Sequence, residues 1–432
     1  IFSIVGLADK EVQESRERIA AAIKNIGALA PHRKSHRVIV NLAPADIKKE
    51  GPAFDLPIAL GYLAASGQIT ALPDHIMFIG ELGLDGSLRS VAGVLPIAIA
   101  CREAGFRELM VPAGNGNEAA VAGVVVREAK NIAEVISHCA GRVELPAYVR
   151  IARPAEHKLA PYDMKDVSGQ RTAKRALEIA AAGRHNILFS GPPGSGKTML
   201  AKALPSILPM LSFDEAIEVS KIYSIAGMLD KEKPLMERAP FRNPHHTSSH
   251  VAMVGGGTSP RPGEITLAHR GVLFLDEFPE FDRRVIEALR EPLEERAITV
   301  ARAQGVYTFP AEFMLVAAMN PCPCGNYGDT TRDCACAPGA ILRYRKKISG
   351  PLLDRIDIHI EVPTVSYEKF KESEGEESRV IRERVEAARN RQAARFTGRA
   401  MRVNAEMGTR EVREYIPLTA SLDQTMRMAH DQ

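Results

Sequence analysis

The pattern of hydrophobic and polar positions predicts a mixture of helices and strands in the first 142 residues. Apolar side chains recur every three to four positions over residues 12–29, which is the spacing of an amphipathic helix. Residues 37–42 form an apolar run typical of a strand, and residues 56–65 predict a buried helix. An Asp-Gly turn signal within residues 81–88 predicts a hairpin. This part is therefore expected to be a domain of its own.

The second half of the chain alternates helices with strongly apolar strands. The strand candidates are residues 186–190, 271–278 and 313–319, and a charged helix is expected near residues 378–396. This alternation is typical of a parallel sheet covered by helices, and hence of the α/β class. Pro-containing polar sequence separates the two halves. We expect an N-terminal domain over residues 1–142, a linker over 143–166, an α/β core over 167–363 and a helical end over 364–432.

Composition narrows the class of protein. The chain has 432 residues, of which 45% are apolar and 25% charged, which excludes a disordered polyelectrolyte. The net charge of +3 is too small for a histone-like polycation, so nucleic-acid binding must depend on a local patch. Six cysteines do not make a disulfide scaffold, and no run approaches the roughly 18 apolar residues of a membrane span. We expect a cytoplasmic protein that binds no membrane.

The ends of the chain are expected to be incomplete. Ile1 stands within a strand-like run, and the helical tail stops at Gln432. We therefore expect further residues on both sides, and an upstream signal segment is not excluded.

A phosphate-binding loop follows the first strand of the α/β core. Glycines let the backbone N–H groups of such a loop turn toward phosphate oxygens, and the following helix adds its partial positive charge. The alternative is a Gly/Pro turn that merely caps a helix. The strand–loop–helix context favours nucleotide binding, with the lysine on the β- and γ-phosphates and the threonine on Mg²⁺. The loop consists of Gly191, Pro192, Pro193, Gly194, Ser195, Gly196, Lys197 and Thr198.

Two acids end the second strand of the core. Asp276 is expected to hold Mg²⁺, and Glu277 to orient and deprotonate the attacking water. The alternative is a strand that ends in two solvated acids. The third strand ends at Asn320, whose amide is suited to the γ-phosphate or the lytic water, although asparagine at this position is often only a turn residue. Together these residues predict ATP hydrolysis.

Four cysteines lie within fifteen residues of a polar loop. Cys322, Cys324, Cys334 and Cys336 have the spacing C-x-C-x9-C-x-C, which suits a closed tetrahedral Zn²⁺ site. The spacing differs from the C-x2-C of zinc ribbons, so a redox-active pair or four free thiols stay open as alternatives. We expect structural zinc.

These motifs together resemble a known family. The segments GPPGSGKT, FRNPHHTSSH, GGGTSPRPGEITLAHRGVLFLDEFPEF, LREPLEE, AAMNPCPCG and SGPLLDRID are similar to the magnesium-chelatase-like AAA+ ATPases of the ComM type. The resemblance implies a ring, usually a hexamer, that uses ATP and Mg²⁺ for branch migration and unwinding of DNA recombination intermediates during natural transformation. It also implies that Asn320 is the sensor-1 residue and that Arg355 is an arginine finger acting on the neighbouring subunit's site. From the residues alone, Arg355 with Asp354 and Asp357 could equally form a local ion pair.

The resemblance assigns two segments to the pore of the ring. These are the helix-2 insert over residues 241–264 and the hairpin over residues 298–309. Donors on a glycine-rich loop can follow a phosphate backbone without reading its sequence. A metal site made by the three histidines of the insert and a merely solvated face made by the basic run are the alternatives. The candidate DNA contacts are His245, His246, Arg261, Arg302, Arg343, Arg345, Lys346 and Lys347.

The N-terminal part resembles the Lon-protease-like domain with the ribosomal-S5-type fold. Ala53 stands where Lon-type peptidases have the nucleophilic serine, and Ile97 stands where they have the lysine base. Because Ala53 has no hydroxyl and Ile97 no amine, peptidase activity is excluded at this site. Subunit packing or DNA contact is the expected role. The family's C-terminal lid carries an arginine-rich helix, and this chain stops before it, so the lid is expected to be incomplete.

Three functions compete at this point. The leading one is an ATP-driven motor on DNA. The second is a magnesium-chelatase-type motor subunit, against which the four cysteines and the fused N-terminal domain argue, or another ATP-driven motor that remodels a protein partner. The third is a non-catalytic ATP-binding scaffold, which the pair Asp276 and Glu277 disfavours.

Overall fold

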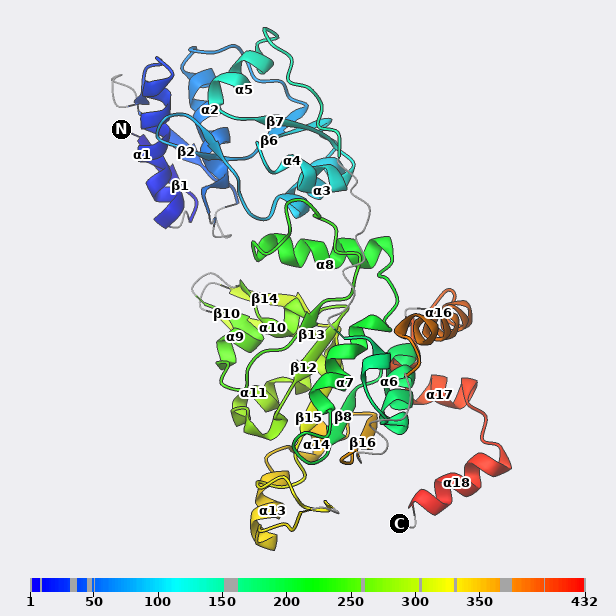
Figure 1. The fold of residues 1–432 in the computed structure, drawn as a ribbon. Coiled ribbons are helices and arrows are strands. Elements are labelled where there is room, and N and C mark those ends of the chain that lie inside the picture. The colour runs from blue at the N-terminus through cyan, green and yellow to red at the C-terminus, as the bar shows by residue number, and fades with distance from the viewer. Residues whose placement is uncertain are drawn as a thin grey trace.

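The structure is a computed structural model with two domains and a helical C-terminal part (Figure 1). It describes residues 2–7, 10–31, 37–44, 49, 51–150, 162–257, 261–302, 305–329, 332–365, 375–399 and 401–430. Within these ranges, no helix combines the length and the apolar character needed to cross a membrane.

The N-terminal domain packs helices against three small sheets. The sheets are a parallel pair β1–β2, a parallel three-stranded sheet in the order β3-β6-β7, and an antiparallel pair β4–β5. Its elements are β1 (Phe2–Val5), α1 (Lys10–Asn25), β2 (Val38–Asn41), α2 (Asp55–Ala65), β3 (Ile76–Phe78), β4 (Glu81–Leu82), β5 (Leu88–Arg89), α3 (Val94–Glu103), β6 (Glu108–Pro112), α4 (Gly116–Ala119), β7 (Val125–Ala129) and α5 (Ile132–Cys139). The helices, strand and hairpin expected from the sequence of this half are confirmed.

The second domain is built on a five-stranded parallel sheet, which confirms the α/β class. The strand order is β16-β8-β15-β12-β9, and every neighbouring pair is parallel. The strands are β8 (Ile187–Ser190), β9 (Phe241–Arg242), β12 (Val272–Leu275), β15 (Met314–Met319) and β16 (Ile358–Glu361). Because all strands run the same way, the residues that follow β8, β12 and β15 meet at one edge of the sheet.

Helices cover both faces of this sheet, and alternate strand residues enter different cores. Phe274 faces the layer that contains α6 and α7, whereas Leu273 and Leu275 face the layer of α9 and α11. The helices of the domain are α6 (Arg171–Gly183), α7 (Lys197–Ala203), α8 (Phe213–Ile225), α9 (His250–Val254), α10 (Glu264–Leu267), α11 (Arg283–Ala288), α12 (Arg290–Glu295), α13 (Pro338–Arg345) and α14 (Gly350–Leu353). Helix α7 ends at Ala203, and a short 3₁₀ turn that contains Pro205, which lacks an N–H donor, follows it.

Two short hairpins project from the domain. Strands β10 (Gly255–Gly256) and β11 (Arg261–Pro262) form one, between α9 and α10. Strands β13 (Ala297–Arg302) and β14 (Gly305–Pro310) form the other, just before β15. They occupy the chain positions of the expected helix-2 insert and pre-sensor hairpin.

Helix α8 lies between the two domains (Figure 1). Toward the N-terminal domain, the carbonyl of Ser224 accepts a hydrogen bond from the Gly93 N–H (3.0 Å), and the Ser224 hydroxyl donates to Glu118 (2.5 Å). Toward the second domain, the Tyr223 hydroxyl donates to the carbonyl of Leu267 (3.0 Å). One helix of the second domain therefore holds the first.

The expected linker contacts both domains at its ends. The Tyr148 N–H donates to the Val126 carbonyl (2.7 Å) of the N-terminal domain, whereas Met164 is buried in the core of the second domain. Residues 151–161 lie outside the described ranges.

Among the described residues of the C-terminal part, three α-helices follow one another. Helix α16 (Ser378–Arg395) packs on α6, where Arg384 pairs with Glu178 (2.7 Å), and α17 (Thr409–Tyr415) and α18 (Ala420–His430) follow. Figure 1 shows α18 extending away from the body of the molecule.

Candidate functional site

The phosphate loop connects β8 to α7 at the edge where the parallel strands end. Gly194 and Gly196 have φ angles of 78° and 94°, in the left-handed region that favours glycine. Gly191 is required for another reason, since a Cβ there would lie 2.2 Å from the carbonyl oxygen of Val362. These glycines permit the backbone path that a phosphate-binding loop needs.

The Lys197 side chain lies inside this loop. Its Nζ donates to the carbonyls of Gly191 (2.7 Å) and Pro192 (2.8 Å) and to Oδ1 of Asn320 (3.3 Å). Burial lowers the pKa of Lys197, with the Asp276 charge acting in the opposite direction. The hydroxyl of Ser195 is buried and has no hydrogen-bond partner among the described residues. A buried ammonium and an unpaired hydroxyl in a glycine loop fit an anionic phosphate ligand.

Thr198 and Asp276 meet across the site. The Thr198 hydroxyl donates to Oδ2 of Asp276 (2.7 Å), and the Glu277 N–H donates to the other carboxylate oxygen, Oδ1 (3.0 Å). A hydroxyl and a carboxylate in contact are oxygen ligands of the kind that Mg²⁺ takes beside nucleotide phosphates. Their placement fits the metal expected there.

Glu277 has an unusual backbone and a specific partner. Its φ of 52° is in the left-handed region, which costs energy for a residue other than glycine. Oε2 of Glu277 lies 3.0 Å from Nδ1 of His246, which belongs to the segment after β9. The rings of His245 and His246 are adjacent, with centroids 4.2 Å apart, and His245 contacts the Thr247 hydroxyl (2.9 Å). The expected DNA-contact segment thus touches the carboxylate expected to activate water.

Arg355 lies beyond α14 and is half exposed. Its guanidinium contacts Oε1 of Glu294 on α12 through Nε (3.0 Å) and Nη2 (2.9 Å). Asp357 instead contacts His185 (3.2 Å). Arg355 is accordingly engaged in an exposed ion pair within its own chain, from which it can be withdrawn at low energetic cost.

The four cysteine sulfurs form a compact group. All four lie within 4.8 Å of one another, and Cys322 Sγ is 3.4 Å from Cys324 and 3.7 Å from Cys334. A tetrahedral Zn²⁺ with bonds of about 2.3 Å places its sulfurs about 3.8 Å apart, so the group fits zinc. Hydrogen bonds, the strongest from the Asn326 backbone, lower the pKa of Cys324 to about 6, whereas the neighbouring thiols contribute to raising the pKa of Cys334 and Cys336, so without a metal the group favours one thiolate.

The histidines of the insert do not form a comparable group. Among the residues that the structure describes, the four cysteines are the one group of three or more His, Cys, Asp or Glu side chains close enough to share a metal ion. The histidine metal site considered from the sequence is therefore not supported there.

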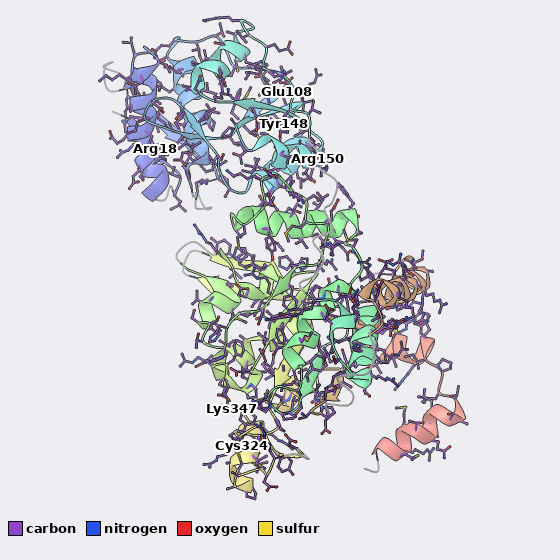
Figure 2. The ribbon with its side chains drawn as sticks, viewed as in Figure 1. Arg18, Glu108, Tyr148, Arg150, Cys324 and Lys347 are labelled. Atoms are coloured by element: carbon purple, nitrogen blue, oxygen red, sulfur yellow. The ribbon has the colours of Figure 1, made fainter. Side chains whose placement is uncertain are left out.

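The basic run after the cysteines divides into two kinds of side chain. Arg345 donates to the Pro321 carbonyl (3.3 Å) and lies over the Tyr327 ring, and Lys347 pairs with Glu280 (3.1 Å). All four basic residues are exposed, and these contacts are what distinguish Arg345 and Lys347 from Arg343 and Lys346. Figure 2 shows Lys347 and Cys324 near the same end of the molecule, opposite Arg18 and Glu108 of the N-terminal domain.

The two hairpins carry the remaining candidate arginines. Arg261 begins β11 and is exposed, and Arg302 ends β13 with a side chain outside the described part of the structure. In the N-terminal domain, Ala53 lies in a short 3₁₀ turn and Ile97 packs in the core on α3. Neither offers a group for peptide hydrolysis.

Sequence reasoning did not find the partners of two of these residues. Nothing in the spacing predicted that His246 would contact Glu277 or that Glu294 would contact Arg355. Both partners lie within segments already quoted for the resemblance, FRNPHHTSSH and LREPLEE, and that was the available signal.

Comparisons with known proteins identify the family. The family described as "Magnesium chelatase, subunit ChlI" matches residues 163–370, "Subunit ChlI of Mg-chelatase" matches residues 1–115, and "Magnesium chelatase, subunit ChlI C-terminal" matches residues 375–432. The competence protein ComM of Haemophilus influenzae is 43% identical over 95% of this chain and 80% of its own length. The chain belongs to the magnesium-chelatase-like AAA+ family of the ComM type. The uncharacterized protein YifB of Salmonella typhimurium is 44% identical over 96% of this chain and 81% of its own length.

A more distant relative is similar to only part of this chain. The RuvB subunit of the Holliday junction branch migration complex of Clostridium kluyveri is 29% identical over 39% of this chain and 40% of its own length. Membership of the AAA+ family points to ATP binding and to oligomeric assembly.

Proposed function

We propose that the protein is an ATP-hydrolysing motor that acts on DNA, driving branch migration and unwinding of recombination intermediates. The contact between His246 and Glu277 carries the proposal (3.0 Å). It joins a segment rich in phosphate-binding donors to the carboxylate suited to activating water. A DNA motor must couple DNA binding to ATP hydrolysis. This contact offers a direct physical connection between the two.

The ATP site supports hydrolysis as well as binding. The loop amides and Lys197 would hold the phosphates, and Thr198 and Asp276 would hold Mg²⁺, which would neutralise charge on the phosphates. Glu277 would orient and deprotonate the attacking water, and Asn320, already hydrogen-bonded to Lys197, would position the γ-phosphate. A protein that binds ATP only as a non-catalytic scaffold would not need a carboxylate such as Glu277 at the end of this strand.

A ring, in which Arg355 acts between subunits, follows from the same reading. Arg355 lies outside its own phosphate loop and pairs with Glu294 at an exposed position. In the proposed hexameric ring, Arg355 would break its ion pair with Glu294 and stabilise the charge on the phosphoryl group that is transferred in the adjacent subunit's site.

The exposed basic side chains favour DNA as the polymer on which the motor acts. Arg261 on the short strand β11, and Arg343 and Lys346 near the end of helix α13, are exposed and have the chemistry for phosphate contacts without sequence preference. The similarity to a protein named for branch migration points the same way. The four cysteines would hold a structural Zn²⁺.

The family name favours a second candidate, a motor subunit for magnesium insertion into a porphyrin. The test is the migration of a synthetic four-way DNA junction by the purified protein with Mg·ATP, with Glu277→Gln as the inactive control. We expect ATP-dependent migration by the wild type and none by the variant, which should still bind ATP. Hydrolysis that leaves the junction intact and is not stimulated by DNA would favour the second candidate.

A further inference from the structure

The cysteine loop rests directly on the phosphate loop. An added Cβ on Gly325 would lie 2.5 Å from Cδ and 2.7 Å from Cγ of Pro193. Gly325 stands next to Cys324, and its N–H donates to the carbonyl of Cys322 (3.0 Å), so the cysteines fix its position. The glycine backbone is thus packed against the ring of a residue inside the ATP site.

A second connection runs through the chain itself. Cys322 is fully buried and follows Asn320 by two residues, and Asn320 accepts a hydrogen bond from Lys197. The Tyr327 N–H donates to Cys322 Sγ (3.3 Å), and Arg345 lies over the Tyr327 ring while it donates to the Pro321 carbonyl. The polar loop from residue 322 to 336 has few apolar side chains of its own, so a metal is what would hold it in this shape.

We propose that the four-cysteine loop is a positioning element of the ATP site, in which metal bound by the cysteines holds Gly325 against Pro193 and thereby sets the affinity for ATP. The inference rests on the proposed ATP-binding function. The metal takes no part in the chemistry. It acts through the backbone of Gly325 on one side of the phosphate loop and through Asn320 on the other.

The chain offers a matched pair of glycines to test this. Gly325 and Gly328 have φ angles of 84° and 77°, so alanine imposes similar backbone strain at both. At Gly328 no described atom lies within 4 Å of an added Cβ. At Gly325 the methyl group would have to displace Pro193 by roughly 1 Å to reach ordinary carbon–carbon contact.

The experiment compares the full-length wild type, Gly325→Ala and Gly328→Ala in an ATP titration with Mg²⁺, together with zinc content and thermal unfolding. We expect Gly325→Ala to weaken ATP binding by about tenfold or more while zinc content is retained, and Gly328→Ala to stay close to the wild type. Equal affinities of the two variants would overturn the proposal. A wild type that does not bind ATP would instead refute the proposed function.

Two further measurements keep the proposal testable if Gly325→Ala folds poorly. Pro193→Ala removes the ring, so the double variant should bind ATP as tightly as Pro193→Ala alone, and additive losses would contradict the contact. Removal of zinc from the wild type by a chelator should lower ATP affinity, and added Zn²⁺ should restore it. Unchanged affinity of the zinc-free protein would overturn the role of the metal.

Discussion

Nδ1 of His246 lies 3.0 Å from Oε2 of Glu277, and the two residues lie in the loops that follow the neighbouring strands β9 and β12. While His246 occupies this oxygen, Glu277 is less able to accept a proton from water. DNA phosphates that attract the imidazole would release the carboxylate. Nucleotide turnover would then rise when DNA is bound.

His246→Ala should therefore raise ATP turnover in the absence of DNA by several-fold and reduce the further stimulation by DNA. Steady-state hydrolysis with and without single-stranded DNA measures both quantities. His245→Ala is a useful comparison because its ring contacts Thr247 instead, and it should raise DNA-free turnover less. Lower DNA-free turnover in His246→Ala would mean that the histidine assists Glu277 instead of restraining it.

Arg355→Ala should still bind ATP, but its rate of ATP hydrolysis should fall by about 10³-fold or more. Mixing it with inactive Glu277→Gln subunits should restore part of the activity, because a mixed ring contains sites with Glu277 from one subunit and Arg355 from the next. Turnover of the mixture and of each variant alone is the measurement. No recovery in rings shown to be mixed would place the action of Arg355 within its own subunit.

The purified protein should contain about one Zn²⁺ per chain. Cys324→Ser and Cys336→Ser should lose the metal because each removes one of four ligands. Cys101→Ala should keep it, since Cys101 is buried in the N-terminal domain away from the cluster. Elemental analysis of the three variants decides the matter, and zinc retained in both serine variants would argue against the four-cysteine site.

His269 should make the protein less stable at mildly acidic pH. Burial lowers the pKa of His269, with the charge of Arg270 adding to the effect, against the opposing influence of Glu218 and Glu312. Since the unfolded chain then binds the proton more readily, stability falls as the pH drops below about 6.5, the ordinary value of histidine. Thermal unfolding at pH 8 and pH 5.5 should show a smaller difference for His269→Gln than for the wild type. An equal difference would remove His269 as the cause.

Local sequence patterns predicted the helices and strands of this protein better than the contacts between them. The strand–loop–helix around Lys197 and the strand before Asp276 followed from periodicity and glycine placement, because both depend on residues close in sequence. The contacts of His246 and Arg355 connect residues about 30 and 60 positions away, respectively. Such pairs depend on which strands become neighbours in the sheet, and a single sequence does not record that order. The contact of Gly325 with Pro193 is of the same kind.

Helix α8 gives the molecule a stiff lever between its two domains. It has 13 residues and is therefore about 20 Å long, and two consecutive residues near its C-terminal end contact the two domains, Ser224 the N-terminal one and Tyr223 the second. A tilt of this helix relative to the second domain would move the N-terminal domain with it. Mechanical work done near the nucleotide would then reach the far end of the protein through packed side chains, independently of the covalent connection between the halves.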